Sequence, residues 1–282
     1  MSALVTLRER ARRTPVGTFL AVLIVNSALV VTALYTVFGS DFPTLAAIPY
    51  AWTPMASAGV TVWLLDDSVR DWLGQLRNVR TGIHWYLAGI GIMLVATDLE
   101  SIVAVGLGVD VVAPAASIGQ YLLFFAVTLF LAGALEELGW RGFMQPRLQQ
   151  RFSALATSVA IGLVWTFWHV PLILADAGNF GAFHEYVVMV VATSVILGWL
   201  YNNTRGALPV VMLTHAASNM APFGEVTGEL PVIFDVVSGN IIFYVACAAL
   251  IVLYAGWKTL TKDGTLPDIP GRRTEKPLQH VD

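Results

Sequence analysis

Long apolar stretches separated by short polar loops dominate the hydrophobic pattern of this chain. Eight windows contain almost no charged residue, and most reach the roughly 20 helical residues that are needed to cross the hydrocarbon core of a bilayer. The pattern predicts an all-α fold, a polytopic transmembrane helix bundle of about eight spans. The windows lie near residues 16–39, 43–65, 83–106, 115–137, 153–175, 185–202, 206–221 and 232–257.

Two of these windows are irregular. Asp98 and Glu100 lie inside the third, where they either mark the outer end of a helix, which we favour, or line a polar path for a substrate. The seventh window is short, and Pro209 near its start is expected to distort it.

Basic residues alternate from loop to loop. Arginines precede the first window, and further Lys and Arg residues occupy every second loop and the segment after the eighth window, whereas the loops between them carry acids only. Cytoplasmic loops of membrane proteins are enriched in Lys and Arg. Eight spans therefore place both termini in the cytoplasm, in a multi-pass protein of the cell membrane.

Composition agrees with a chain whose main partner is the lipid bilayer. Charged residues make up 12% of the 282 residues, about half of the ~25% that is typical of soluble domains. Cys247 is the only cysteine, which excludes a disulfide framework and a cysteine-based metal site. The sequence has no basic tract with interleaved aromatic residues, so nucleic acid is not an expected partner.

Three polar clusters interrupt the apolar windows between Leu135 and Asn219. Polar groups in the hydrocarbon region are costly, and those that persist usually face the bundle interior and serve function. Each cluster alone has a structural alternative, as a charged helix end, a hydrogen-bonded packing histidine, or a polar contact between helices. The clusters contain Glu136, Glu137 and Arg141, then His169, then His215 and Asn219.

Spacing assigns these residues to helix faces. Glu137 and Arg141 are four residues apart in the order that favours an ion pair on a helix. Glu136 then points about 100° away from Glu137 and is free to face another partner. His215 and Asn219 are also four residues apart, so both side chains can face the same partner.

The depths in the membrane that we estimate for the three clusters are consistent with a common site. If Pro146 does not end the fourth helix and the chain turns near Phe152, Glu136 and His169 each lie about 16 residues, or roughly 24 Å, from that turn. His215 lies about 10 residues, or roughly 15 Å, from the next basic turn, and helix tilt can compensate for the difference. We therefore expect the clusters to converge near the midplane or in the cytoplasmic half of the membrane.

This set of side chains suits amide hydrolysis, which needs an activated water, a general base and stabilisation of the oxyanion. Glu136, His169 and His215 can hold a divalent metal, with zinc as the expected ion, or can position the water by hydrogen bonds alone. Asn219 can donate to the oxyanion, and Arg141 would fix Glu137 in place.

At these residues the sequence resembles the CPBP family of CAAX-protease and bacteriocin-processing intramembrane endopeptidases, also called the ABI family. The resemblance covers residues 115–221. The matching motifs are Glu-Glu-x-x-x-Arg at Glu136, Glu137 and Arg141, Phe-x-x-x-His at Trp165 to His169 with Trp in place of Phe, and His-x-x-x-Asn at His215 and Asn219.

The resemblance implies an eight-helix peptidase in which Glu136 activates water, while His169, His215 and Asn219 complete the site. Members have been described as metal-dependent and as glutamate-dependent, and their substrates are peptides or proteins, some membrane-anchored or lipidated. The chain is therefore predicted to consist of spans 1–3 (1–114), a catalytic core of spans 4–7 (115–221), span 8 (222–262) and a disordered cytoplasmic tail (263–282).

Two other functions remain open at this stage. Glu136 and His169 would also suit a proton relay in a transporter, and a membrane protein with these motifs can act as a non-catalytic scaffold or immunity protein. Against the transporter, no pair of Gly- or Pro-broken spans occupies matching positions in two halves of the chain. Trp140, Trp165 and Trp168 are expected to wall the site.

Overall fold

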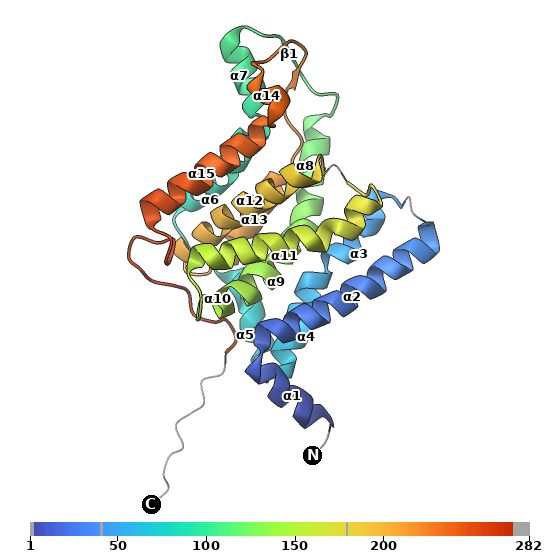
Figure 1. Ribbon diagram of the computed structural model, residues 1–282, viewed down its shortest axis with the longest axis vertical. Coiled ribbons are helices and arrows are strands. Elements are labelled where there is room, and N and C mark those ends of the chain that lie inside the picture. Colours follow the sequence, from blue (N-terminus) through green and yellow to red (C-terminus); the bar gives the residue numbers. More distant parts are fainter. Residues whose placement is uncertain (1–2, 40–41, 179, 273–282) are drawn as a thin grey trace, which may run out of the picture.

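The structure, a computed structural model, describes residues 3–39, 42–178 and 180–272. The fold is helical, as predicted, and both ends of the described chain lie on the same side of the bundle (Figure 1). The longer helices are α1 (Ala3–Arg13), α2 (Pro15–Phe38), α4 (Thr53–Leu64), α6 (Ile83–Thr97), α7 (Leu99–Leu107), α8 (Ile118–Phe130), α11 (Ala154–Leu174), α12 (Phe183–Asn203), α13 (Leu208–Ser218) and α15 (Gly239–Ala255).

Shorter elements connect the long helices. An antiparallel pair of two-residue strands, which the sequence did not predict, joins the loops before α8 and after α13, with Val111 opposite Val226 and Val112 opposite Glu225. The short elements are η1 (Thr44–Ala47), α3 (Ile48–Ala51), α5 (Val69–Gly74), η2 (Gln75–Arg77), β1 (Val111–Val112), η3 (Gly133–Glu136), α9 (Glu137–Gly139), the π-helical η4 (Trp140–Met144), α10 (Gln145–Leu148), β2 (Glu225–Val226) and α14 (Ile233–Val236).

Within the described residues, four helical stretches are long and apolar enough to cross a membrane. They are α2, the stretch Ile118–Leu148, α11 and α12. The bent pair α6 and α7, with 63° between its halves, makes a fifth if it is one span. The eight-span count thus remains a prediction for α3–α4, α13 and α15, which are shorter.

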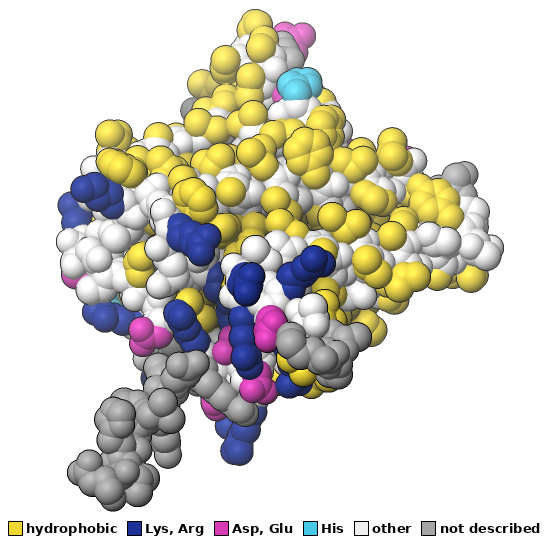
Figure 2. All heavy atoms as spheres, turned by 60° about the horizontal axis from the view of Figure 1, so that its bottom comes forward, with side chains coloured by type: hydrophobic (Ala, Val, Ile, Leu, Met, Phe, Trp, Pro, Cys, Tyr) yellow, Lys and Arg dark blue, Asp and Glu magenta, His cyan; other side chains and the backbone are white. Residues whose placement is uncertain are grey.

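Apolar side chains cover much of the outer surface of the bundle. Figure 2 shows Lys and Arg side chains gathered at one end, next to a broad hydrophobic surface. Ile24 on α2, Leu122 on α8 and Leu253 on α15 are 69%, 63% and 82% exposed. Contiguous exposed apolar surface of this extent marks contact with lipid or another protein, which agrees with a multi-pass membrane protein.

α12 lies at the centre of the bundle, between α11 and α15 (Figure 1). The approach of α11 to α12 is close, since a Cβ on Gly162 would lie 2.8 Å from the Cα of Val191. α13 packs against α6 and α12, and α2 with α4 covers the opposite side of α9. The short segments η3, α9 and η4, which contain the Glu136–Arg141 motif, are therefore enclosed by helices from both halves of the chain.

The fourth predicted window is interrupted rather than continuous. α8 ends at Phe130, and Ala132, with φ −128° and ψ −128°, breaks the helix before η3 begins. The indole Nε1 of Trp52 donates to the freed carbonyl of Leu131 at 2.6 Å. Pro146 does not end the helical path, because it occupies the first turn of α10. Proline has no N–H to offer the carbonyl of Gly142, four residues earlier, and this carbonyl accepts from Gln75 Nε2 at 3.3 Å.

Asp98 and Glu100 hold the end of the molecule where α7, β1 and α14 lie, at the top of Figure 1. Asp98 Oδ1 accepts from the backbone N–H of Phe223 at 2.6 Å, and Glu100 Oε1 accepts from that of Gly239 at 2.8 Å. Asp98 thus fixes the loop that leaves α13 and Glu100 fixes the start of α15, which favours their interpretation as helix-end residues.

The segment after α15 contacts the bundle, and a disordered tail beginning at residue 263 remains a prediction. Ser68 N–H donates to the carbonyl of Gly271 at 2.8 Å, and Asn202 Nδ2 donates to that of Thr259 at 2.8 Å. Within residues 263–272, whose polar composition suggested disorder, Asp263 also pairs with Arg205 at 3.1 Å. Residues 273–282 of the predicted tail lie outside the described residues.

Candidate active site

A buried carboxylate connects two of the three clusters. Arg141 Nη1 donates to both carboxylate oxygens of Glu137 at 3.0 Å each, and His215 Nδ1 lies 2.7 Å from Glu137 Oε1. Glu137 and Arg141 are completely buried, and His215 is 3% exposed. The ion pair predicted from the four-residue spacing is therefore present, although the backbone between its members passes from α-helix to π-helix.

Arg141 also contacts residues of α11 and α12. Its Nη2 donates to Ser194 Oγ on α12 at 2.9 Å, and its guanidinium lies 5.2 Å from the ring centroid of Trp165 on α11. Ser194 in turn donates to the carbonyl of Ser158 on α11 at 2.7 Å. The cation thus joins the motif segment to α11 and α12, and its charge is compensated by Glu137.

Glu136 has a different environment from its neighbour. Its Oε2 accepts from the indole N–H of Trp165 at 2.8 Å and from that of Trp140 at 3.3 Å. The side chain is 3% exposed, and the other oxygen, Oε1, has no hydrogen-bond partner within the part of the chain that the structure describes. One carboxylate oxygen is therefore anchored, and the second is available to a water or substrate.

His169 lies at the edge of the same cluster. Its Nδ1 is 2.9 Å from the carbonyl of Trp165, one turn earlier on α11. Since a carbonyl only accepts, this contact places the proton on Nδ1 and leaves Nε2 as an acceptor. The ring packs against Trp168 and Tyr186, with centroids 4.6 Å and 5.7 Å away.

His215 and Asn219 lie together beside a glycine. A Cβ added to Gly133 would be 3.0 Å from His215 Nε2 and 3.6 Å from Asn219 Nδ2. Because Glu137 binds Nδ1, the Nε2 atom of His215 is the one that faces outward from the ion pair. Asn219 is exposed at the end of α13, and its Nδ2 donates to the carbonyl of His215 at 3.0 Å.

The three clusters therefore meet, as predicted. Trp165 is the common neighbour, since it donates to Glu136, supplies the carbonyl for His169 and lies 5.1 Å from the ring of His215. Asn219 is at the rim rather than in the interior. The catalytic roles of these side chains remain predictions.

Comparison with known proteins identifies this region. Residues 118–221 match the family described as type II CAAX prenyl endopeptidase Rce1-like. Over this segment, the chain is similar to the Rce1-like family. The chain is also similar to CAAX prenyl protease 2 of Methanococcus maripaludis, with 28% identity over 100 residues. That match covers 33% of this chain and 37% of the length of the relative.

The Rce1-like segment contains all six predicted site residues, but they do not form a metal site in this arrangement. Among the described residues there is no group of three His, Cys, Asp or Glu side chains placed to hold a metal ion. Glu136 Oε2, His169 Nδ1 and His215 Nδ1 have partners, whereas Glu136 Oε1, His169 Nε2 and His215 Nε2 have none among the described residues. Metal binding by Glu136, His169 and His215 remains a prediction.

Sequence reasoning missed two contributors to the Rce1-like site and underestimated two others. Trp140 and Trp165 were expected as walls, and the structure makes them hydrogen-bond donors to Glu136. Ser194 and Gly133 were not predicted at all. A serine within an apolar window was a signal for Ser194, whereas nothing in the sequence near Gly133 indicates that it faces a histidine 82 residues away.

Proposed function

We propose that this protein is an intramembrane endopeptidase in which Glu136 activates a water molecule to attack a peptide carbonyl. The observation that carries the proposal is the unequal pairing of the two adjacent glutamates. Glu137 is fully occupied by Arg141 and His215, whereas Glu136 keeps one carboxylate oxygen free among apolar walls. A carboxylate shielded from water in this way is a suitable proton acceptor.

In the proposed reaction, water bound between Glu136 Oε1 and His169 Nε2 loses a proton to Glu136 as its oxygen attacks the carbonyl carbon. The tetrahedral intermediate then breaks its C–N bond, and the proton passes from Glu136 to the departing nitrogen. Asn219 Nδ2, beside Gly133, donates to the oxyanion, and His215 Nε2 does so as well when the ring carries a proton on both nitrogens, because its Nδ1–H is bound to Glu137. Arg141 and Glu137 act by holding the ring of His215 in this orientation.

The proposed substrate is a membrane-anchored peptide or protein. All site residues lie on segments within or next to candidate membrane spans, so a substrate that is itself held in the bilayer reaches them most readily. The matched relative is named as a CAAX prenyl protease, which makes a lipidated cysteine near the scissile bond the first chemistry to test.

The transporter alternative is less well supported. Both hydrogen-bond partners of Glu136 within the described residues are indole N–H groups, and an indole N–H donates without accepting a proton. A proton on Glu136 therefore cannot be passed on to either of these indole groups.

The test uses purified protein in detergent with internally quenched peptides, each made with and without a farnesylated cysteine. Glu136→Gln keeps the shape of the side chain but removes the base, so cleavage should fall by about 10²–10⁴-fold. Glu229→Gln, in an exposed loop, is the control and should cleave normally. Cleavage by Glu136→Gln at the wild-type rate would exclude the proposed base.

The same preparation separates the other functions. Uptake of a solute or protons into proteoliposomes without peptide cleavage would support a transporter. Partner binding without either activity would support a scaffold or immunity protein. Faster cleavage of the farnesylated peptides than of their unmodified counterparts would support a lipidated substrate.

A further inference from the structure

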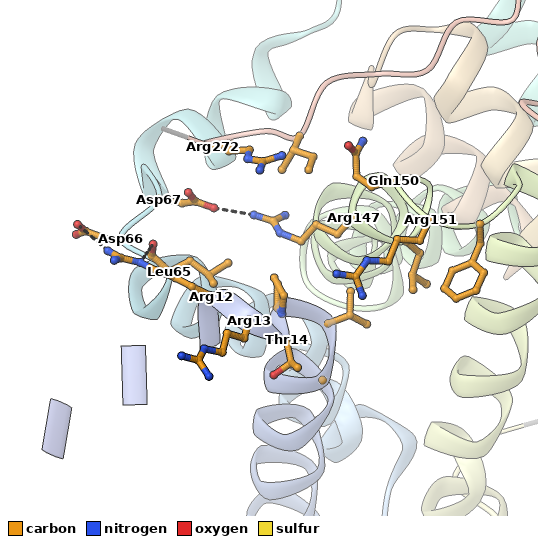
Figure 3. Close-up of a pocket in the computed structure, with 16 residues that line it drawn as sticks. Arg12, Arg13, Thr14, Leu65, Asp66, Asp67, Arg147, Gln150, Arg151 and Arg272 are labelled. Atoms are coloured by element: carbon orange, nitrogen blue, oxygen red, sulfur yellow. Dashed lines mark hydrogen bonds and ion pairs between the residues drawn. The ribbon is translucent and has the colours of Figure 1, made fainter. Parts of the chain in front are cut away.

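A cavity of about 920 Å³ opens at the basic end of the bundle (Figure 3). Its walls come from the junction of α1 and α2, the turn after α4, the end of α10 and the segment after α15. None of the six candidate site residues lines it. Five arginines and two aspartates do, which gives an excess of three positive charges: Arg12, Arg13, Arg147, Arg151, Arg272, Asp66 and Asp67.

The two acids already have arginine partners. Arg147 Nη2 lies 2.9 Å from Asp67 Oδ2, and Arg12 Nη2 lies 3.5 Å from Asp66 Oδ2. The other three lining arginines form no ion pair with any of the described residues. The cavity therefore presents cationic groups that the described residues do not neutralise with ion pairs.

These cations are close together. Figure 3 shows Arg147 and Arg151 extending from the end of α10 into the cavity, with Arg272 on another wall. Arg272 is near enough to Arg147 for the two like charges to repel each other. A cluster of like charges is electrostatically unfavourable by itself. A bound anion would reduce the repulsion, because guanidinium groups bind phosphate with charge-assisted hydrogen bonds.

The remaining lining is apolar. Val16, Leu148 and Ile269 contribute to the walls, and so does Phe152, which is 57% exposed. Val16 lies in the first turn of α2, a candidate membrane span. The cavity thus places cations directly beside the level at which the bilayer begins, an arrangement that suits an amphiphile better than a free ion.

We propose that this cavity binds the headgroup of an anionic phospholipid from the adjacent leaflet. The headgroup phosphate lies among Arg151, Arg272 and Arg147, and the glycerol and acyl chains follow Phe152 and the start of α2. Basic pockets between membrane helices are known to hold anionic headgroups. The site is separate from the Glu136 site, so the proposal does not depend on the proposed peptidase activity.

The experiment measures thermal unfolding of the full-length protein in mixed micelles, titrated with phosphatidylglycerol, with phosphatidylcholine or with inorganic phosphate. Ligand that binds the folded state raises the melting temperature according to its dissociation constant. Phosphatidylglycerol should raise it saturably, and the other two should not. The double variant Arg151→Gln/Arg272→Gln should bind phosphatidylglycerol roughly 25-fold more weakly, about fivefold for each arginine.

The matched control is Arg77→Gln/Arg80→Gln, which removes the same charge from exposed positions outside the cavity. It should bind phosphatidylglycerol like the wild type. An equal loss in both double variants would show only diffuse attraction to an anionic surface and would overturn the proposal. An equal shift with inorganic phosphate would overturn it in favour of a soluble anion, and an equal shift with phosphatidylcholine would show that headgroup charge is not recognised.

Discussion

Replacing Arg141 with methionine tests the buried ion pair directly. The change leaves the carboxylate of Glu137 completely buried without the guanidinium that donates to both its oxygens at 3.0 Å. Removing one partner of a buried pair typically costs about 3–5 kcal/mol. For a chain of this size that corresponds to a fall in melting temperature of roughly 6–20 °C. Tryptophan fluorescence during heating of the detergent-purified protein measures it, since the sequence has nine tryptophans.

A double-mutant cycle then separates two contributions to the loss of stability: the cost of a buried, unpaired carboxylate at Glu137 and the cost of lost packing. Arg141→Met combined with Glu137→Gln removes both charges, so the double variant should be more stable than Arg141→Met alone. Arg205→Met is the control, because its pair with Asp263 is exposed, and its melting temperature should not change measurably. The reasoning fails if Arg141→Met melts like the wild type, or if the second substitution brings no recovery.

Two glycines in the motif segment give further predictions. Gly133→Ala places a Cβ 3.0 Å from His215 Nε2 and should lower the peptide cleavage rate with little change in melting temperature; Gly91→Ala, where nothing lies within 4 Å, is the neutral control in both assays. Gly139→Ala places a Cβ 2.7 Å from the carbonyl oxygen of Pro54, so it should destabilise the fold by about 1–3 kcal/mol, seen as a lower melting temperature. A Gly139→Ala protein with unchanged melting would contradict the close approach.

Local spacing was the most reliable guide to the site. The Glu137–Arg141 pair survives the passage into a π-helix because residues four apart remain on neighbouring turns. The level placement of Glu136 and His169 is supported too, since Trp165 contacts both side chains. These relations depend on helix geometry and on a short hairpin, which are properties that a sequence expresses within some 35 residues.

Contacts between distant segments were beyond this reasoning. The break after α8 is stabilised by Trp52, 79 residues earlier, which donates to Leu131. Arg141 binds Ser194, 53 residues later, through a geometry that only the packing of α12 on α11 defines. The prediction of eight spans rests on hydropathy, which measures the length of apolar segments. Hydropathy does not reveal breaks within a segment, such as the one at Ala132.

The break after α8 explains how two adjacent carboxylates acquire different tasks. A continuous helix from α8 would carry its side chains past the site, whereas the turn at Ala132 starts a new helical segment at Gly133, beside His215. Glu137 then faces a cation and an imidazole that neutralise and fix it, and Glu136, about 100° around the helix, faces only indole donors. A single backbone irregularity thus brings both carboxylates to the site, where Glu137 is paired and Glu136 keeps one oxygen without a partner among the described residues.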